Sequence, residues 1–196
     1  MDSIDYYNKY ATAYFESSVN LDMSKIREKF EALLPEGGAI LDLGCGSGRD
    51  SLAFFENEYE VTPLDGSKEM CALAEIHTDL DVLHMEFADL DFDEVFDGVW
   101  ACASLLHVPE EEMPDILKKI GQALKPGGIF FLSVKEGDFA GIRNGRYFVD
   151  YSKRKLTELV EDAGMFDIEE VWRTEDVRGT LKEQKWLNLI ARKKEE

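Results

Sequence analysis

The chain has 196 residues, 44% of them hydrophobic and 32% charged, which suits one domain with a substantial core. Its formal net charge of −19 repels nucleic-acid phosphates and so disfavours an RNA or DNA substrate. It has no apolar run of the ~18 residues that span a membrane, no signal-peptide pattern and no CxxC pair, so we expect a cytoplasmic protein with neither disulfide framework nor metal site.

The N-terminal segment, residues 1–36, is predicted to be helical and to cap the domain that follows. Aromatic side chains recur in it at intervals of three and four residues, among them Tyr6, Tyr10 and Tyr14. A second amphipathic stretch ends at Pro35. The aromatics either close over a bound cofactor, with Tyr14 as a contact, or pack against the domain with no ligand.

Residues 37–196 are predicted to form an α/β domain. Short apolar runs alternate with helical patterns, which predicts a parallel sheet covered by helices on both faces. The last two runs are joined only by 174–183, too short for a helical crossover, so they are expected to pair antiparallel. The expected strands are 39–43, 59–64, 81–84, 97–102, 128–134, 166–173 and 184–192, and the expected helices are 49–57, 67–76, 110–124 and 152–164.

A glycine-rich loop follows the first predicted strand, in the sequence Leu43-Gly44-Cys45-Gly46-Ser47-Gly48-Arg49. Its glycines allow a sharp turn and the close approach of a ligand, and such loops between a strand and a helix bind nucleotides and cofactors. A dinucleotide fingerprint has its third glycine where Arg49 stands, and no Gly-Lys-Ser/Thr follows as in a P-loop. A cofactor made of a nucleoside and an amino acid is therefore favoured over a nicotinamide cofactor.

Two acids follow the next two predicted strands. Asp65 stands about twenty residues after the loop, where a carboxylate can accept both hydroxyl hydrogens of a ribose. The alternative is that Asp65 caps the following helix. Asp89 stands where an acid can take an amino hydrogen of adenine, and its alternative is a plain loop acid.

The segments ILDLGCGSGRD, VTPLDGS, FADLDFDEVFDGVWACASLLHVP and LKPGGIFFLSVKEG occur in an order that resembles the motifs of class I S-adenosylmethionine-dependent methyltransferases. The resemblance covers residues 38–135. It implies a Rossmann-like three-layer αβα sandwich whose seven-stranded, mostly parallel sheet has the order 3-2-1-4-5-7-6, with strand 7 antiparallel. It also implies S-adenosylmethionine as cofactor and S-adenosylhomocysteine as product. A weaker similarity, to tellurite-resistance methyltransferases, rests on Gly48-Arg49-Asp50-Ser51 and does not name the acceptor.

The resemblance assigns cofactor contacts by position. It implies that the loop backbone holds the methionine part, that Asp65 holds the ribose and that Ala88-Asp89-Leu90 holds the adenine. Arg49 either pairs with the carboxylate of the cofactor or bridges surface acids. The predicted cofactor-binding residues are Tyr14, Gly44, Cys45, Gly46, Arg49, Asp65, Gly66, Ser67, Met70, Ala88, Asp89, Leu90 and Cys102.

The methyl acceptor is expected beside residues 102–107 and the segment 135–148. This segment is rich in glycine and arginine, and it forms either a substrate lid or a solvated loop. His107 is either a base or a lining residue, and Tyr147 is a second catalytic candidate. The predicted substrate-binding residues are Ser104, His107, Arg143, Arg146 and Tyr147.

Together these features predict an enzyme that moves a methyl group from S-adenosylmethionine to a small molecule, with the arginines favouring an anionic one. Positioning the two reactants supplies most of what such a displacement needs. The alternatives are a protein or nucleic-acid acceptor, a catalytically silent S-adenosylmethionine-binding protein, and a nicotinamide-dependent oxidoreductase. We expect a monomer or a homodimer.

Overall fold

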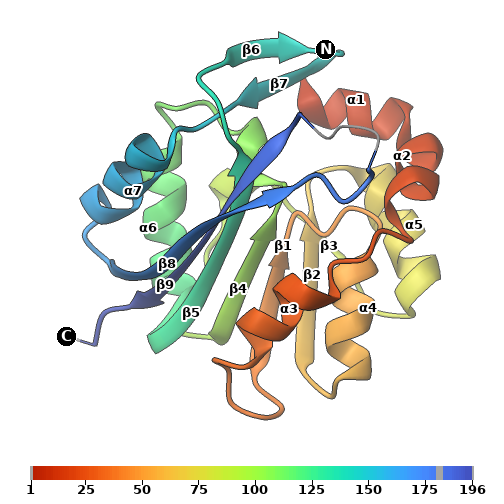
Figure 1. The fold of residues 1–196 in the computed structure, drawn as a ribbon. Coiled ribbons are helices and arrows are strands. Elements are labelled where there is room, and N and C mark those ends of the chain that lie inside the picture. The colour runs from red at the N-terminus through yellow and green to blue at the C-terminus, as the bar shows by residue number, and fades with distance from the viewer. Residues whose placement is uncertain (1, 180–182, 196) are drawn as a thin grey trace.

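A computed structural model describes residues 2–179 and 183–195, which form a three-layer sandwich around a seven-stranded sheet (Figure 1). The sheet order is β3-β2-β1-β4-β5-β9-β8, and β9 runs antiparallel to both of its neighbours. The predicted fold, the sheet order and the antiparallel strand are confirmed. The strands are β1 Ala39–Leu43, β2 Glu60–Asp65, β3 Leu83–His84, β4 Phe96–Cys102, β5 Leu124–Lys135, β8 Phe166–Glu175 and β9 Lys185–Lys193.

Helices cover both faces of the sheet, because side chains that alternate along each strand supply two separate cores. On one face Trp100 and Phe131 pack with residues of α3 and α4, and on the other Val99 and Phe130 pack with residues of α6 and α7. No helix in the described ranges is long and apolar enough to cross a membrane. The helices named so far, together with α5, are α3 Ser24–Glu31, α4 Arg49–Glu56, α5 Lys68–Thr78, α6 Met113–Ala123 and α7 Lys153–Asp162.

The N-terminal segment divides between two places. Helices α1 (Ser3–Lys9) and α2 (Ala11–Ser18) lie near the ends of the strands where β6 and β7 also lie (Figure 1). Helix α3 instead packs on the sheet through Phe30, against the backbone of Gly98, where a Cβ would stand 2.6 Å from the ring. Only α1 and α2 are therefore placed as a cap would be.

The segment after β5 is a β-hairpin of its own. Strands β6 (Ala140–Arg143) and β7 (Arg146–Val149) pair antiparallel and form a second, two-stranded sheet. Their turn is Asn144-Gly145, with φ of 51° and 79°, a pair that favours tight hairpins because both residues tolerate positive φ. The hairpin places Arg146 and Tyr147 above the sheet on a regular strand.

The packing of α3 predicts a stability effect. Phe30 is fully buried, with its ring centroid 5.2 Å from that of Trp100 and 5.9 Å from that of Phe54. We expect Phe30→Ala to lower the free energy of unfolding by about 3–5 kcal/mol, measured by urea denaturation. The control Phe55→Ala removes a ring that is 51% exposed and should cost roughly 1 kcal/mol or less. Equal losses in the two variants would contradict this account of the core.

Candidate functional site

Two adjoining cavities lie at the carboxyl ends of the parallel strands, the edge where open α/β sheets bind ligands. The larger has a volume of about 530 Å³ and the smaller about 150 Å³. The N-terminal helices, the glycine loop and the segment after β4 contribute to both. The residues in both walls are Tyr7, Tyr14, Gly44, Gly46, Ala103 and His107.

Asp65, at the end of β2, lies in the wall of the larger cavity. Its Oδ2 accepts a hydrogen bond from the Gly46 backbone N–H at 2.9 Å, and its Oδ1 accepts one from Ser67 N–H at 2.8 Å. Burial raises the pKa of Asp65, and these backbone bonds oppose the rise. The following helix is capped by the Ser67 side chain, which accepts from Met70 N–H. The carboxylate keeps lone pairs for the hydroxyl hydrogens of a ribose.

The rest of the larger cavity is mainly apolar, with Met70 and Phe87 in its wall. Of the three residues predicted at the adenine, Ala88 lines this cavity, whereas Asp89 is exposed outside its wall and Leu90 is buried in the core. Sequence reasoning missed Phe87, which directly precedes them and whose aromatic ring was the available signal. Gly66 and Ser67, two more of the predicted cofactor-binding residues, also line this cavity.

In the glycine loop, Gly44 and Gly46 place backbone in the walls of both cavities and form a cradle for a ligand. Gly44 has φ of 79°, and a Cβ there would stand 2.4 Å from the Ser104 Cβ. Ser104 itself donates to the Leu43 carbonyl at 2.6 Å. At Gly46 the nearest atom to an added Cβ would be in Tyr14, at 3.6 Å. A larger residue at Gly44 would therefore collide with Ser104, whereas at Gly46 the backbone itself lines both cavities.

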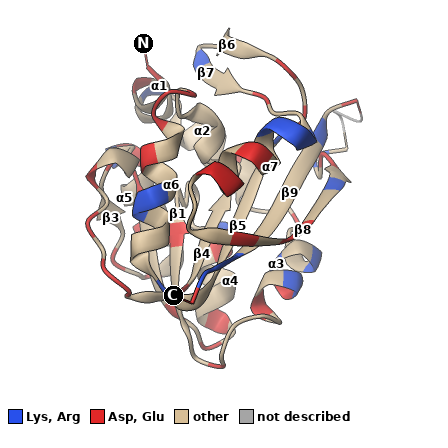
Figure 2. Cartoon of the chain, turned by 90° about the vertical axis from the view of Figure 1, so that its left-hand side faces the viewer, with Lys and Arg blue, Asp and Glu red and all other residues tan. Residues whose placement is uncertain are grey.

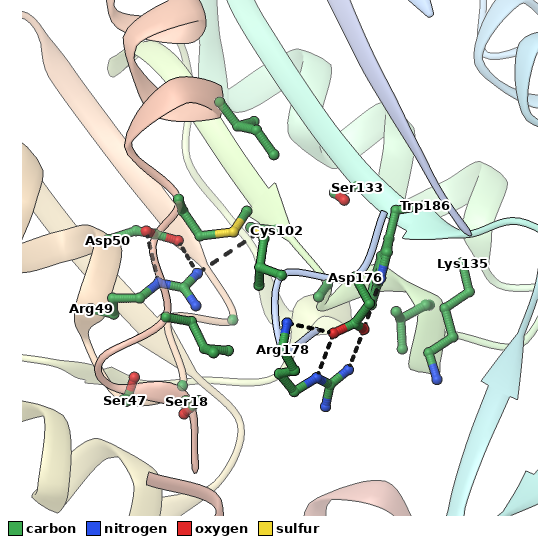
Figure 3. A pocket seen from close by; sticks show the side chains of 18 of the residues that line it. Ser18, Ser47, Arg49, Asp50, Cys102, Ser133, Lys135, Asp176, Arg178 and Trp186 are labelled. Atoms are coloured by element: carbon green, nitrogen blue, oxygen red, sulfur yellow. Dashed lines mark hydrogen bonds and ion pairs between the residues drawn. The ribbon is translucent and has the colours of Figure 1, made fainter. Parts of the chain in front are cut away.

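Arg49 is held by a buried acid, a partner that neither sequence alternative named. Its Nη2 and Nε donate to Asp50 at 2.6 and 3.0 Å, and its Nη2 lies 4.0 Å from the Cys102 sulfur (Figure 3). Burial opposes the ionisation of Asp50, but Arg49 and Arg27 outweigh it and hold its pKa below the ordinary value. For Asp42, burial and the neighbouring Asp50 raise the pKa. Cys45 joins Arg49 and Cys102 in the wall of the smaller cavity.

Tyr7 and His107 form a hydrogen-bonded pair between the cavities. His107 Nδ1 lies 2.6 Å from the Tyr147 carbonyl, which can only accept, so Nδ1 carries the hydrogen and Nε2 is bare. The Tyr7 hydroxyl, 2.9 Å from Nε2, therefore donates to it, and the Tyr7 oxygen accepts from Arg146 Nη1 at 3.1 Å. Burial lowers the pKa of His107 to about 4. At neutral pH the imidazole is uncharged.

The far side of the smaller cavity holds residues that sequence reasoning missed. Asp176, at the end of β8, accepts from Arg178 and from Trp186 Nε1 (Figure 3). Its pKa is held at about 2, chiefly by the hydrogen bond from Arg178. The signal that the sequence offered on this side was Asn188, a polar residue between two leucines in strand β9. The walls on this side are Ser133, Lys135, Arg146, Phe148, Thr174, Asp176, Arg178, Trp186 and Asn188.

The predicted substrate residues are not all brought together. Arg146 lines the smaller cavity, and Tyr147 lines the larger one. Ser104 lines the larger cavity and His107 lines both. Arg143 lies in neither wall and pairs with Asp150 at 2.6 Å.

Comparisons with known proteins agree on the family. Residues 40–128 match a family model described as "Methyltransferase domain". The putative methyltransferase YqeM of Bacillus subtilis is 28% identical over 180 residues, which cover 86% of this chain and 66% of that protein, so this chain spans about two thirds of its relative's length. A crystal structure of Burkholderia thailandensis 1,6-didemethyltoxoflavin-N1-methyltransferase, with bound 1,6-didemethyltoxoflavin and S-adenosylhomocysteine, is 26% identical, covers 95% of this chain and 86% of that one, and has a TM-score of 0.74. A methyltransferase structure from Methanosarcina mazei is 25% identical, covers 90% and 100%, and also has a TM-score of 0.74.

The chain therefore belongs to the class I S-adenosylmethionine-dependent methyltransferases, the enzymes whose cofactor is S-adenosylmethionine. The residues present fit that cofactor. Gly44 and Gly46 bring backbone to the walls of both cavities, the Asp65 carboxylate lines the larger one, and the apolar wall there suits a purine. The family and the cofactor predicted from the ordered motifs are confirmed, and no finding supports the tellurite-resistance similarity.

The buried imidazole predicts a pH dependence. An unfolded His has a pKa near 6.5, whereas folded His107 stays neutral down to about 4. The unfolded chain therefore binds the proton first as pH falls. The free energy of unfolding then decreases between about pH 6.5 and 4, by at most about 1.4 kcal/mol per pH unit. Imidazole NMR signals, with His107→Gln for assignment, should show no His107 titration between about pH 8 and 5.5. A midpoint near pH 6.5 would contradict the placement.

Proposed function

We propose that this protein transfers a methyl group from S-adenosylmethionine to a small molecule, with the donor's nucleoside in the larger cavity and the acceptor at the far side of the smaller one. One observation carries the proposal. Tyr7, Gly46 and His107 line both cavities, so a donor whose nucleoside fills the larger cavity can extend its methionine part into the smaller one, beside the acceptor. When bound, the cofactor supplies an activated methyl group on a sulfonium.

For the donor, we propose that Asp65 accepts the ribose hydroxyls and that Met70, Phe87 and Ala88 enclose the adenine. Asp65 is oriented for this role because both of its oxygens are fixed by backbone N–H groups. The proposed methionine contacts are Tyr14, Gly44, Cys45, Gly46, Arg49 and Cys102, which line the smaller cavity. Asp89 and Leu90 do not line the larger cavity, so their contact with the adenine stays a prediction. Such a contact would have to come from their backbone or follow a shift of the loop.

For the acceptor, the size of the smaller cavity and the basic residues Lys135 and Arg146 in its walls support a small anionic molecule rather than a protein or a nucleic acid. The relative from Burkholderia thailandensis binds a small molecule, 1,6-didemethyltoxoflavin, together with S-adenosylhomocysteine. Arg146 is proposed as an acceptor contact because it reaches the smaller cavity from β7. Arg143 would act one step away, by holding Asp150 beside the hairpin.

We propose that His107 positions Tyr7 and does not take the acceptor's proton. A base with a pKa of about 4 is weak at neutral pH. Burial, followed by the neighbouring Tyr14, raises the pKa of Tyr7, which keeps its hydroxyl hydrogen for His107 Nε2. Tyr147 contributes its carbonyl to this arrangement. A nucleophile that already carries a lone pair then needs only to be aligned.

The donor site is tested by binding. We expect S-adenosylhomocysteine to bind the purified protein in calorimetry and Asp65→Ala to weaken that binding at least about tenfold, because charge-assisted hydrogen bonds to the ribose are lost. Asp81→Ala, an exposed acid outside both walls, is the matched control and should bind as the wild type does. Unchanged affinity in Asp65→Ala would refute the proposed site.

The reaction itself is tested with labelled donor. Incubation of the protein with methyl-labelled S-adenosylmethionine and a metabolite extract should place label in the low-molecular-weight fraction. A label found only in protein or nucleic acid would reject the small-molecule acceptor. No label in any fraction, despite S-adenosylhomocysteine binding, would favour a catalytically silent binding protein.

A further inference from the structure

Positive charge gathers around one aromatic ring at the far side of the smaller cavity. Lys135 Nζ lies 4.5 Å from the centroid of the Phe148 ring, Arg146 Cζ lies 5.0 Å from it and Arg143 Cζ lies 5.4 Å from it. In a chain with a net charge of −19, such a cluster is a local exception. Figure 2 shows basic residues at β7 and at the start of α7, amid acids on many other elements.

Some cations in and around this cavity are neutralised by carboxylates. Arg143 pairs with Asp150 at 2.6 Å, and Arg178 pairs with Asp176 at the same distance. Lys135 and Arg146 differ: within residues 2–179 and 183–195 neither has a carboxylate at ion-pair distance. Two positive charges thus face this end of the cavity without an acidic partner.

The same walls contain buried polar atoms without partners. Three buried side-chain nitrogen or oxygen atoms in the described residues lack a hydrogen bond, and two of them, Arg146 Nε and Asn188 Oδ1, belong to residues of this cavity. Asn188 is fully buried, and its Nδ2 donates to Thr174 Oγ1 at 3.0 Å, while its Oδ1 makes no hydrogen bond. Unpaired buried groups are rare in folded proteins, and their grouping in one wall indicates a ligand.

We propose that Lys135, Arg146 and Asn188 form the recognition site for a carboxylate-bearing acceptor. The carboxylate lies against Lys135 and Arg146, and an O–H or N–H of the same molecule donates to Asn188 Oδ1. Phe148 and Trp186 supply aromatic walls, which suit a planar ring between these two ends. This inference rests on the proposed function and adds the chemical class of the acceptor.

The charge balance at Lys135 supports the assignment. Burial, followed by repulsion from Arg143, lowers the pKa of Lys135, and Asp150 opposes this shift only in part. A bound anion would offset both the burial and the repulsion. Arg178 and Arg146 also lower this pKa, so all three neighbouring arginines favour an anion here.

The cations lie apart from the cofactor cradle. Lys135 ends β5, and in Figure 3 the Asp176–Arg178 pair stands between it and the Arg49–Asp50 pair. On the cradle side of the cavity, Arg49 is the residue proposed to contact the methionine part of the cofactor, through Nη1, the guanidinium nitrogen that makes no bond to Asp50. Lys135 is therefore free to serve the second ligand.

The test is calorimetric titration of the protein saturated with S-adenosylhomocysteine. The probes are the ortho, meta and para hydroxybenzoates, the matching neutral hydroxybenzamides, and benzoate, which lacks the hydroxyl donor. We expect at least one hydroxybenzoate to bind, with its amide and benzoate each at least about tenfold weaker. Lys135→Met should weaken this binding at least about tenfold and leave S-adenosylhomocysteine affinity unchanged, while Lys135→Arg retains most of it.

The matched control is Lys155→Met, which removes a partly exposed lysine of α7 that pairs with Glu110. It should bind the hydroxybenzoate as the wild type does, which separates local recognition from net charge.

The inference is overturned if S-adenosylhomocysteine binds but no hydroxybenzoate does, or if amides bind as well as acids. It is also overturned if Lys135→Met weakens S-adenosylhomocysteine instead, since the cation would then serve the cofactor. Failure of S-adenosylhomocysteine to bind the wild type refutes the proposed function itself. The comparison of acid with amide uses the wild-type protein, so it stands even if a variant fails to fold.

Discussion

The buried carboxylate of Asp50 is the interaction on which the geometry of the site depends. A charge with 5% exposure must be paired, and Asp50 accepts from Arg27 on α3, from Arg49 on α4 and from the indole N–H of Trp100 on β4. Trp100 in turn stacks on Phe131 with ring centroids 4.0 Å apart. Asp50 thus connects α3 and α4 to the aromatic core. It also fixes the start of α4, which directly follows the glycine loop.

The sequence was sufficient for the sheet because each parallel strand is a short apolar run followed by turn residues. It was insufficient where distant residues meet. The amphipathic pattern around Phe30 predicts a helix, but its seat on Gly98 depends on a contact across 68 positions of sequence that no local pattern records. The hairpin after β5 is a different case, because the Asn144-Gly145 pair was a local signal that the lid interpretation overlooked.

The same division holds for the site. The cofactor-binding part of the site could be predicted from the glycine loop and Asp65. Their spacing is that of one strand–loop–helix unit and the strand that follows it. The proposed acceptor side of the smaller cavity includes Lys135, Asp176 and Asn188, which come from three strands or their ends and share no spacing. Among these strands the order is set by long-range pairing, so their side chains meet only once the antiparallel β9 is in place.

Tyr7 joins the two halves by its position on a helix of only seven residues. So short a helix has little stability of its own and depends on its contacts. These include the Tyr7 bond to His107 and the Ser3 side chain, which accepts from Tyr147 N–H at 3.1 Å. Because Tyr7 lies in the walls of both cavities, a displacement of α1 would open both at once, and the exit of one product would depend on the exit of the other.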